Sequence, residues 1–164
     1  MSTVDETTHR RVSNFIFHEC QLADESRWNE WEALLADDMH YWVPVAGANA
    51  DPDRDVSIIN DNRSRLRTRL KQLKTGTRHS QAPLSVMRRM LSNMVILLAD
   101  DGLTEVEANF VIYEYQTQSM MALNTWPGRV RYRLRASGES FEIVQKRVDL
   151  IMASGNLPSM AFIV

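Results

Sequence analysis

Few residues of this sequence carry side chains that could hold a metal ion or activate a nucleophile. There are four histidines and one cysteine, namely His9, His18, His40, His79 and Cys20. Mononuclear iron in a facial triad needs two histidines and a carboxylate, but no predicted helix places two histidines one turn apart on one face. A Rieske cluster needs two cysteines and two histidines, which one cysteine cannot supply. We therefore expect no cofactor and no metal in this chain, and no redox catalysis by this chain alone.

The strongest candidate for acid–base chemistry is His40, which stands beside Tyr41 and two residues after Asp38. In a cone-shaped α+β fold, these three side chains could line an internal pocket and catalyse an isomerisation, a dehydration or a cyclisation. The competing interpretation, which we favour, makes His40 a polar member of a strand. His18 next to Glu19 is typical of a pair on the surface of a helix.

An alternating row of arginines marks the most regular stretch of the chain, from Gly128 to Met152. In this stretch Arg129, Arg131, Arg133 and Arg135 alternate with Val130, Tyr132, Leu134 and Ala136. A period of two predicts a β-strand, because successive side chains leave a strand on opposite faces. The turn residues 137–140 join this strand to a second one, which predicts a long hairpin. Four like charges on a central strand are unfavourable unless they are solvated or matched, so we expect solvent or matching groups against that face.

Three helices are predicted before the long strands. Apolar residues recur at helical spacing over residues 8–24. Ser26 is a candidate N-cap for a second, shorter helix, which residues 37–38 end. The apolar side of that helix consists of Trp28, Trp31, Leu34 and Leu35. Asn60 or Asp61 can cap a third helix, whose apolar side consists of Leu66, Leu70 and Leu73.

Extended segments are predicted between and after these helices. Residues 39–45 alternate, and Pro44 indicates that this strand lies at an edge or ends there. Residues 46–55 are rich in Ala, Gly, Asn, Asp and Pro and are predicted to form a loop. A strand over residues 88–99 is apolar on both faces for much of its length, so we expect it to be covered on both sides. Residues 104–118 alternate again.

The end of the chain completes the predicted fold. Residues 119–128 are predicted to form a connection, because Pro127–Gly128 is a turn signal. Residues 160–164 are short and apolar and are predicted to form a last strand. Helices followed by a run of antiparallel strands favour an α+β class, with a curved sheet that carries the N-terminal helices on one face. The length favours one domain over residues 1–164.

Composition limits the partners of this chain. The net charge is -2, which gives no general reason to expect nucleic acid. The basic run from Arg63 to Lys74 is either a solvated helix face or a charged docking face, and the sequence leaves both open. Cys20 alone excludes a disulfide framework within the chain, and we interpret it as a small buried apolar residue. The sequence shows no signal region and no membrane span, so we expect a cytoplasmic protein.

The open face of the predicted sheet is the best candidate for a protein–protein interface. It carries the arginine row, Trp42, and in our interpretation Tyr113 and Tyr115. Arginine and aromatic side chains are enriched at interface hot spots. Within one chain, the same residues could instead stack on each other. The predicted interface residues are Trp42, Arg88, Trp126, Arg129, Arg131, Arg133 and Arg135.

Several of these segments together resemble a known family, the small (β) subunit of bacterial aromatic-ring-hydroxylating dioxygenases. The N-terminal match consists of Phe17, Glu19, Leu22, Asp24, Trp28, Trp31, Leu34, Asp38, Tyr41 and Pro44. The later matches are Asp61, Leu66 and Arg69, then Pro83, Ser85, Arg88 and Asn93, then Gly128, Arg129, Leu134, Arg135, Lys146, Arg147 and Val148. The order and spacing of these residues carry the resemblance over nearly the whole chain. Departures occur at Val86, where an arginine is expected, and at residues 150–152.

The resemblance implies a cone-shaped fold like that of nuclear transport factor 2. It also implies a hexamer of three α and three β subunits, in which the β subunits associate with each other and with α. In such enzymes the α subunit carries the Rieske [2Fe-2S] cluster, the mononuclear iron and the substrate pocket. The β subunit is implied to be mostly structural, without a cofactor or catalytic residues of its own.

Overall fold

The computed structural model describes residues 2–75, 85–117, 121–155, 160 and 162–164. Three α-helices and seven β-strands are assigned within these ranges. The helices are α1 (Glu6–Asp24), α2 (Trp28–Ala33) and α3 (Arg63–Lys74), and a short 3-10 helix η1 spans Gly47–Asn49. The strands are β1 (Ser2–Thr3), β2 (Leu35–Pro44), β3 (Ser57–Asn62), β4 (Val86–Leu98), β5 (Thr104–Gln116), β6 (Ala122–Ser137) and β7 (Ser140–Leu150).

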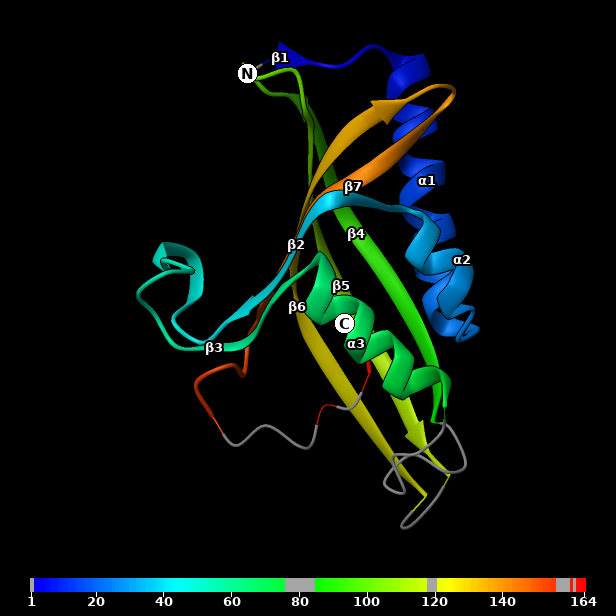
Figure 1. The fold of residues 1–164 in the computed structure, drawn as a ribbon, viewed down its shortest axis with the longest axis vertical. Helices are drawn as coiled ribbons and strands as arrows, with labels where there is room; N and C mark the ends of the chain where they lie inside the picture. Colours follow the sequence, from blue (N-terminus) through cyan, green and yellow to red (C-terminus); the bar gives the residue numbers. More distant parts are fainter. Residues whose placement is uncertain (1, 76–84, 118–120, 156–159, 161) are drawn as a thin grey trace.

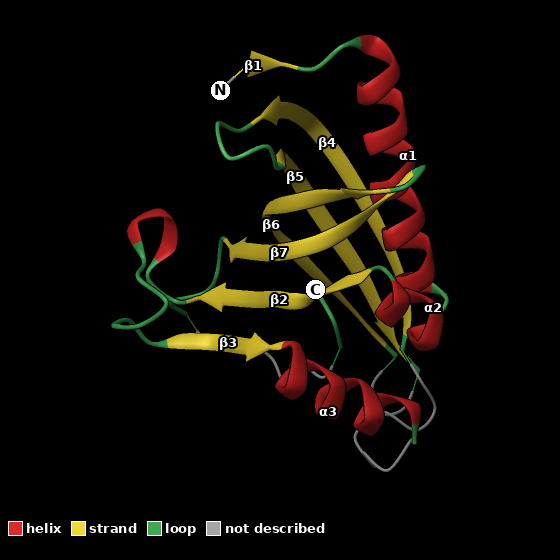
Figure 2. Cartoon of the chain, turned by 45° about the horizontal axis from the view of Figure 1, so that its top comes forward, coloured by secondary structure: helices red, strands yellow, loops and turns green. Residues whose placement is uncertain are grey.

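The strands form one strongly twisted sheet in the order β1-β4-β5-β6-β7-β2-β3 (Figure 1). Strand β2 runs parallel to β7, and every other pairing is antiparallel. Figure 2 shows the three helices gathered on one side of the curved sheet. The other side is uncovered within the described chain, and we call it the open face. The α+β class, the long hairpin and the position of the helices are therefore confirmed.

Helix α1 begins two residues before the predicted start, because Asp5 is its N-cap. The Asp5 carboxylate accepts a hydrogen bond from the Thr8 backbone N–H at 3.0 Å, which satisfies a donor that the first turn leaves free. The predicted N-cap of α2 is wrong: Ser26 lies one residue too early, with φ 55°, and Arg27 occupies the N-cap position without a side-chain hydrogen bond. The buried face of α2 consists of Trp28 and Trp31, as predicted, whereas Leu34 is the C-cap and Leu35 begins β2.

Strands β2 and β3 form in segments whose residues favour a helix end or a turn, because the two strands pair with each other. The second helix ends at Ala33, so Asp37 and Asp38 lie in β2 rather than at a helix terminus. Strand β3 was not predicted, because its Asn and Asp residues are typical of turns. It forms because it pairs with β2 in antiparallel register. The N-cap of α3 is consequently Asn62, whose side chain accepts from the Arg65 backbone N–H at 3.0 Å.

The predicted connection over residues 119–128 is also wrong in part, since β6 already begins at Ala122. Pro127 and Gly128 lie inside the strand. Strand β7 pairs with β6 only from Gly128 onward, so before that point β5 is the only strand paired with β6 among the described residues. Proline lacks a backbone N–H and is tolerated where a strand has a free edge. A turn signal therefore marks the place where β6 changes from an edge strand to a central one.

Two further predictions about strands do not hold. Strand β4 is covered on one face only, because Met90 and Val95 are 60% and 51% exposed. Residues 162–164 are not in a strand; instead the Val164 N–H donates to the Tyr41 hydroxyl at 2.9 Å. Within the described part of the chain, no helix is long and apolar enough to cross a membrane.

Candidate functional site

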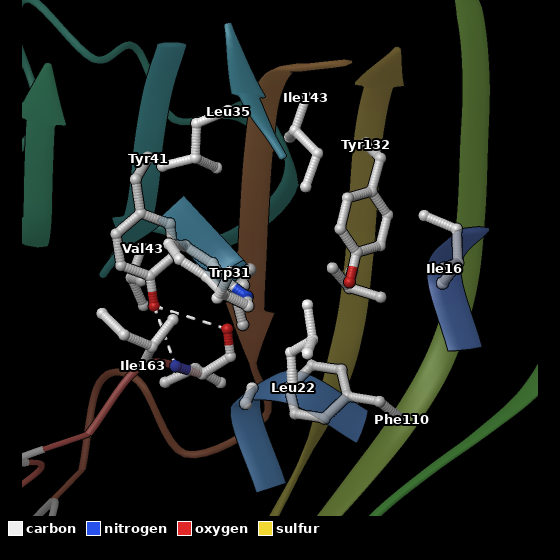
Figure 3. Packing of buried hydrophobic residues seen from close by; sticks show 14 of the residues in the cluster. Ile16, Leu22, Trp31, Leu35, Tyr41, Val43, Phe110, Tyr132, Ile143 and Ile163 are labelled. Carbon is white, nitrogen blue, oxygen red and sulfur yellow. Dashed lines mark hydrogen bonds between the residues drawn. The ribbon is translucent and has the colours of Figure 1, made fainter. Parts of the chain in front are cut away.

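The space between the sheet and the helices contains a fully buried ion pair. Glu19 on α1 and Lys146 on β7 are 0% and 2% exposed. The Lys146 ammonium donates to Glu19 Oε1 at 2.8 Å, Trp31 Nε1 donates to the same oxygen at 2.6 Å, and the Tyr132 hydroxyl donates to Oε2 at 3.0 Å. Figure 3 shows Trp31 and Tyr132 pointing into this interior. The prediction that Glu19 lies on the helix surface is therefore wrong.

Electrostatics within this buried cluster favour the ionised carboxylate. Burial by itself would raise the pKa of Glu19. The charge and hydrogen bond of Lys146, the charge of Arg89 and the hydrogen bond from Trp31 outweigh burial and hold the pKa below its usual value. Burial raises the pKa of the neighbouring Cys20 thiol to about 12, so this thiol stays protonated and is a poor nucleophile. The interpretation of Cys20 as a buried apolar residue agrees with this environment.

Little free volume remains in this interior. A cavity of about 10 Å³ lies among Cys20, Phe110, Tyr132 and Lys146, which is the size of about one water molecule. Small-molecule sites have volumes of roughly 300–1,000 Å³. In the part of the chain that the structure describes, the interior of the fold is thus filled by its own side chains.

The three acid–base candidates are not brought together. Tyr41 points into the core, where its hydroxyl accepts the Val164 N–H. His40 lies on the open face, where its Nε2 is 2.8 Å from Asn60 Oδ1. Asp38 accepts two hydrogen bonds from Arg135, at 3.1 and 2.6 Å, and the Arg135 hydrogen bond lowers the pKa of Asp38. These positions agree with our interpretation of His40 as a polar member of a strand.

The arginine row lies on the open face and is matched by carboxylates of the same sheet. Arg131 Nε lies 2.7 Å from Glu107 Oε2, and its Nη1 lies 2.9 Å from Asp149 Oδ2. Arg129 shares Glu107 at 3.2 Å. The remaining pairs are Arg133 with Asp101 and Glu105, Arg135 with Asp38 and Glu142, and Arg147 with Asp149. We call this set of ion pairs the arginine ladder. It explains how four guanidinium groups are tolerated on one strand.

The other predicted interface residues have different environments. Trp42 is on the open face but is covered by Arg147, whose guanidinium carbon lies 4.3 Å from the ring centroid, and its Nε1 donates to Ser57 Oγ at 2.9 Å. Trp126 is 1% exposed and points into the core, where its Nε1 donates to Glu114 at 3.1 Å. Trp126 is therefore not available for contact with another subunit. Arg88 is exposed and lines a groove beside α1 together with Asp24 and Glu25.

The basic run on α3 is partly neutralised by the rest of the chain. Arg63, Arg67 and Lys74 all contact the Glu32 carboxylate, at 3.1, 3.3 and 2.8 Å. Arg69 pairs with Asp61 at 2.7 Å. These contacts tie α3 to α2 and to β3, so much of the run serves the packing of this helix rather than an external ligand.

The fold brings few potential metal donors together. Among the described residues there is no group of three or more His, Cys, Asp and Glu side chains that could hold a metal ion. His79 lies outside the described residues. One cysteine cannot provide the two thiolates of a Rieske cluster. The ring nitrogens of His40 lie beside the side-chain amides of Asn60 and Gln145 rather than beside a second histidine. The residues described here do not fit a resident iron site.

Sequence reasoning missed the buried cluster and the carboxylates of the ladder, although both left a signal. Glu19 is spaced three residues from Ile16 and from Leu22, which places a charge on the apolar side of α1. Glu105 and Glu107 alternate with apolar residues in the strand that pairs with the arginine row. A period of two on both strands would have indicated cross-strand ion pairs.

Comparisons with known proteins agree with this architecture. A family model described as "Ring hydroxylating beta subunit" matches residues 18–154. The small oxygenase component of the p-cumate 2,3-dioxygenase system of Pseudomonas putida is 32% identical over 145 residues, covering 87% of this chain and 79% of its own. The β subunit of biphenyl 2,3-dioxygenase of Rhodococcus jostii is 25% identical over 156 residues, covering 88% of this chain and 82% of its own.

Solved structures extend the comparison to the fold. The β subunit of benzoate 1,2-dioxygenase from Burkholderia mallei superposes with a TM-score of 0.75 at 24% identity, covering 99% of this chain and 100% of its own. A scytalone dehydratase-like protein from Novosphingobium aromaticivorans gives a TM-score of 0.66 at 13% identity, covering 89% and 85%, so the predicted cone-shaped fold is confirmed. Because the family match spans most of the chain, this protein belongs to the ring-hydroxylating dioxygenase β-subunit family and is the β subunit of a bacterial aromatic-ring dioxygenase.

Proposed function

We propose that this chain is a non-catalytic structural subunit that supports the assembly of iron-bearing α subunits. The complex contains three α and three β subunits, and the α subunits carry the Rieske cluster and the mononuclear iron. The complex adds dioxygen to an aromatic compound in bacterial aromatic catabolism, with electrons delivered from NAD(P)H by partner proteins. In this proposal the present chain neither binds the aromatic compound nor holds a cofactor.

The single observation that carries the proposal is the filled interior of the fold. An enzyme on this scaffold needs a cavity with converging polar groups. Here two of the buried polar groups, Glu19 and Lys146, are bound to each other and to Trp31 and Tyr132. A second buried carboxylate, Glu114, accepts from Trp126 and Ser85. The pocket of about 10 Å³ beside these groups admits no aromatic ring. The pocket of about 440 Å³ on the open face is lined by arginines and carboxylates of the ladder that are paired with each other. The polar groups are therefore used for the internal cohesion of the subunit.

The names of the relatives are consistent with a subunit role. Relatives are described as a small oxygenase component or as a β subunit of dioxygenases for p-cumate, benzene and biphenyl. A fold by itself does not fix function, so the proposal rests on the interior and on this family membership together. The aromatic substrate of the complex belongs to the pocket of another chain.

The proposal is tested by coexpression with the α subunit that accompanies this chain. We expect one large oligomer that contains both chains, with iron in α, and turnover that is unchanged by His40→Ala in this chain. Asn109→Ala, another open-face substitution, is the matched control. A loss of turnover in His40→Ala with unchanged assembly and iron content would contradict the proposal, because it would assign chemistry to this chain. Recovery of an active α oligomer that does not bind this chain would also contradict it.

A further inference from the structure

The inner face of the sheet is crossed by three buried residues that belong to no helix or strand. Phe162, Ile163 and Val164 are 3%, 0% and 3% exposed, although they lie in irregular backbone. Figure 3 shows Ile163 beside Tyr41 within this interior. Irregular segments usually run over the surface of a protein, so a buried one indicates a specific role. We call these three residues the plug.

Aromatic side chains of two strands hold the ends of the plug. The Phe162 ring packs edge-to-face on Trp126 of β6, with ring centroids 5.4 Å apart. The Val164 N–H donates to the Tyr41 hydroxyl of β2 at 2.9 Å. The Trp126 Nε1 donates to the buried Glu114 carboxylate at 3.1 Å, so the position of the indole is fixed by the sheet and not by the plug.

Arg89 of β4 supplies the polar contact in the middle of the plug. Its side chain is 3% exposed, and Asp24 of α1 accepts hydrogen bonds from both its backbone N–H and its Nη1. Arg89 Nη2 donates to the Ile163 carbonyl, whereas the buried Nε has no hydrogen-bond partner among the described residues. A guanidinium group binds a carboxylate through two neighbouring N–H groups. The single carbonyl of the plug therefore leaves one donor of the Nε–Nη2 edge unsatisfied, which is unfavourable in a buried site.

The space that the plug fills has the dimensions of a small-molecule site. Arg89, Ile112 and Trp126 form one cross-strand row, so the backbones that carry the guanidinium and the indole are two strand spacings, roughly 10 Å, apart. A benzene ring with one carboxylate group spans such a gap when it contacts both side chains.

The walls of this space are otherwise mainly apolar. Val164 borders the pocket of about 10 Å³, whose apolar lining includes Leu91, Phe110, Ile112, Val130 and Val148. Without the plug, this pocket and the volume of three residues join into a cavity within the range of ligand sites, roughly 300–1,000 Å³.

We propose that the plug closes a latent binding site whose ligand is a small aromatic carboxylate. The ring of the ligand takes the place of Phe162 against Trp126. Its carboxylate accepts from Arg89 Nε and Nη2 in place of the Ile163 carbonyl. Ligand and plug exclude each other, so the site is closed in the form described here, in agreement with the filled interior. The inference goes beyond the proposed function, because it concerns this chain alone and holds with or without an α partner.

Calorimetric titration of the full chain with benzoate, the simplest ligand of this class, is the first test. Phe162→Ala vacates the ring position, and Ile163→Lys places a second cation beside Arg89 in a buried position, which expels the plug. The affinity of a site that is open in only a fraction of the molecules is reduced by that fraction. Each variant is therefore expected to bind benzoate at least tenfold more tightly than the unsubstituted chain. Benzamide, which has the ring without the charge, should bind at least tenfold more weakly than benzoate.

The matched control is Leu134→Ala, which opens a cavity on the same inner face but at a distance from Arg89. Leu134 is 0% exposed and lies in the cross-strand row of Thr104 and Leu98, at the other end of β4 from Arg89. Such an apolar cavity admits neutral aromatic molecules, so Leu134→Ala should bind benzoate no better than the unsubstituted chain. Absence of benzoate binding by both folded plug variants, equal affinity for benzoate and benzamide, or equal binding of benzoate by Leu134→Ala would overturn the inference.

Exchange of the Val164 amide hydrogen, followed by NMR on the unsubstituted chain, tests the plug without any substitution. This amide is bonded to the Tyr41 hydroxyl, so it exchanges slowly while the plug is in place. High concentrations of benzoate should speed its exchange several-fold and leave the exchange of the Ile16 amide in α1 unchanged. Acetate, which lacks the ring, should have no effect. Unchanged exchange of the Val164 amide in benzoate, or equal acceleration by acetate, would contradict the proposed exchange of plug and ligand.

Discussion

Replacing Lys146 by methionine would leave the Glu19 carboxylate buried without its cation. Glu19 is 0% exposed, and its ammonium partner lies at 2.8 Å. Removal of one member of a buried ion pair costs roughly 3–5 kcal/mol, because the remaining charge stays desolvated. For a chain of this length, that loss corresponds to a decrease in the unfolding temperature of roughly 6–20 °C. Trp31 and Tyr132 still donate to the carboxylate, which keeps the expected cost near the lower end of this range.

The dependence of this effect on pH gives the sharper test. In the unsubstituted chain the pKa of Glu19 lies below its usual value, so the ion pair contributes stability above a pH of about 4.3 and loses it as the pH falls further. In Lys146→Met, burial becomes the dominant influence and raises the pKa of Glu19. A folded protein whose buried carboxyl has a raised pKa is most stable when that carboxyl is protonated. The variant therefore regains stability as the pH falls from 7 toward about 4.5.

Chemical denaturation at pH 7 and pH 5 measures both effects. We expect the difference in unfolding free energy between Lys146→Met and the unsubstituted chain to be smaller at pH 5 than at pH 7. The control is the double variant Glu19→Gln, Lys146→Met, in which the amide oxygen can still accept from Trp31 or Tyr132 and neither position carries a charge. This variant should recover most of the lost stability and lose the pH dependence. A pH-independent loss below about 1 kcal/mol for Lys146→Met would refute the reasoning.

Three further predictions follow from particular contacts. Burial raises the pKa of Cys20 to about 12, so the native chain at pH 8 should react with a thiol reagent far more slowly than the unfolded chain; equal rates would contradict the buried position. Gly128→Ala places a Cβ 2.5 Å from the Asp149 carbonyl oxygen and should lower the unfolding free energy by roughly 1–3 kcal/mol. The control is Gly155→Ala, whose Cβ lies 3.5 Å from the Met152 carbonyl oxygen and which should leave the unfolding free energy nearly unchanged. Arg135→Ala removes an exposed pair with Asp38 and should leave the midpoint of a denaturant titration nearly unchanged. A clear decrease of that midpoint would show that the end of the ladder contributes to folding.

Elements with a clear apolar period were predictable from the sequence. The spacing of Leu66, Leu70 and Leu73 predicted the buried face of α3, and these residues are at most 9% exposed. The alternation of the arginine row likewise predicted both its strand and its outward direction. In these cases a local pattern and the tertiary contacts agree, so no knowledge of distant partners was needed.

Elements that depend on a distant partner were not predictable. Strand β3 has turn-forming residues and exists because β2 lies beside it. Trp126 was assigned to a connection because Pro127–Gly128 follows it, but β5 extends past the end of β7 and pairs with this segment. The alternative site of His40, Tyr41 and Asp38 assumed one shared pocket. Neighbouring residues of a strand point to opposite faces, and β2 places Tyr41 in the core and His40 outside it.

The most direct test of the central claim is a paired measurement of iron content and aromatic turnover on this chain alone, on α alone and on the complex. We expect the complex to oxidise an aromatic substrate, all of its iron to remain with α after the subunits are separated, and the isolated chain to show neither iron nor turnover. Stoichiometric iron that stays with the isolated chain, or turnover by this chain without α, would contradict the account.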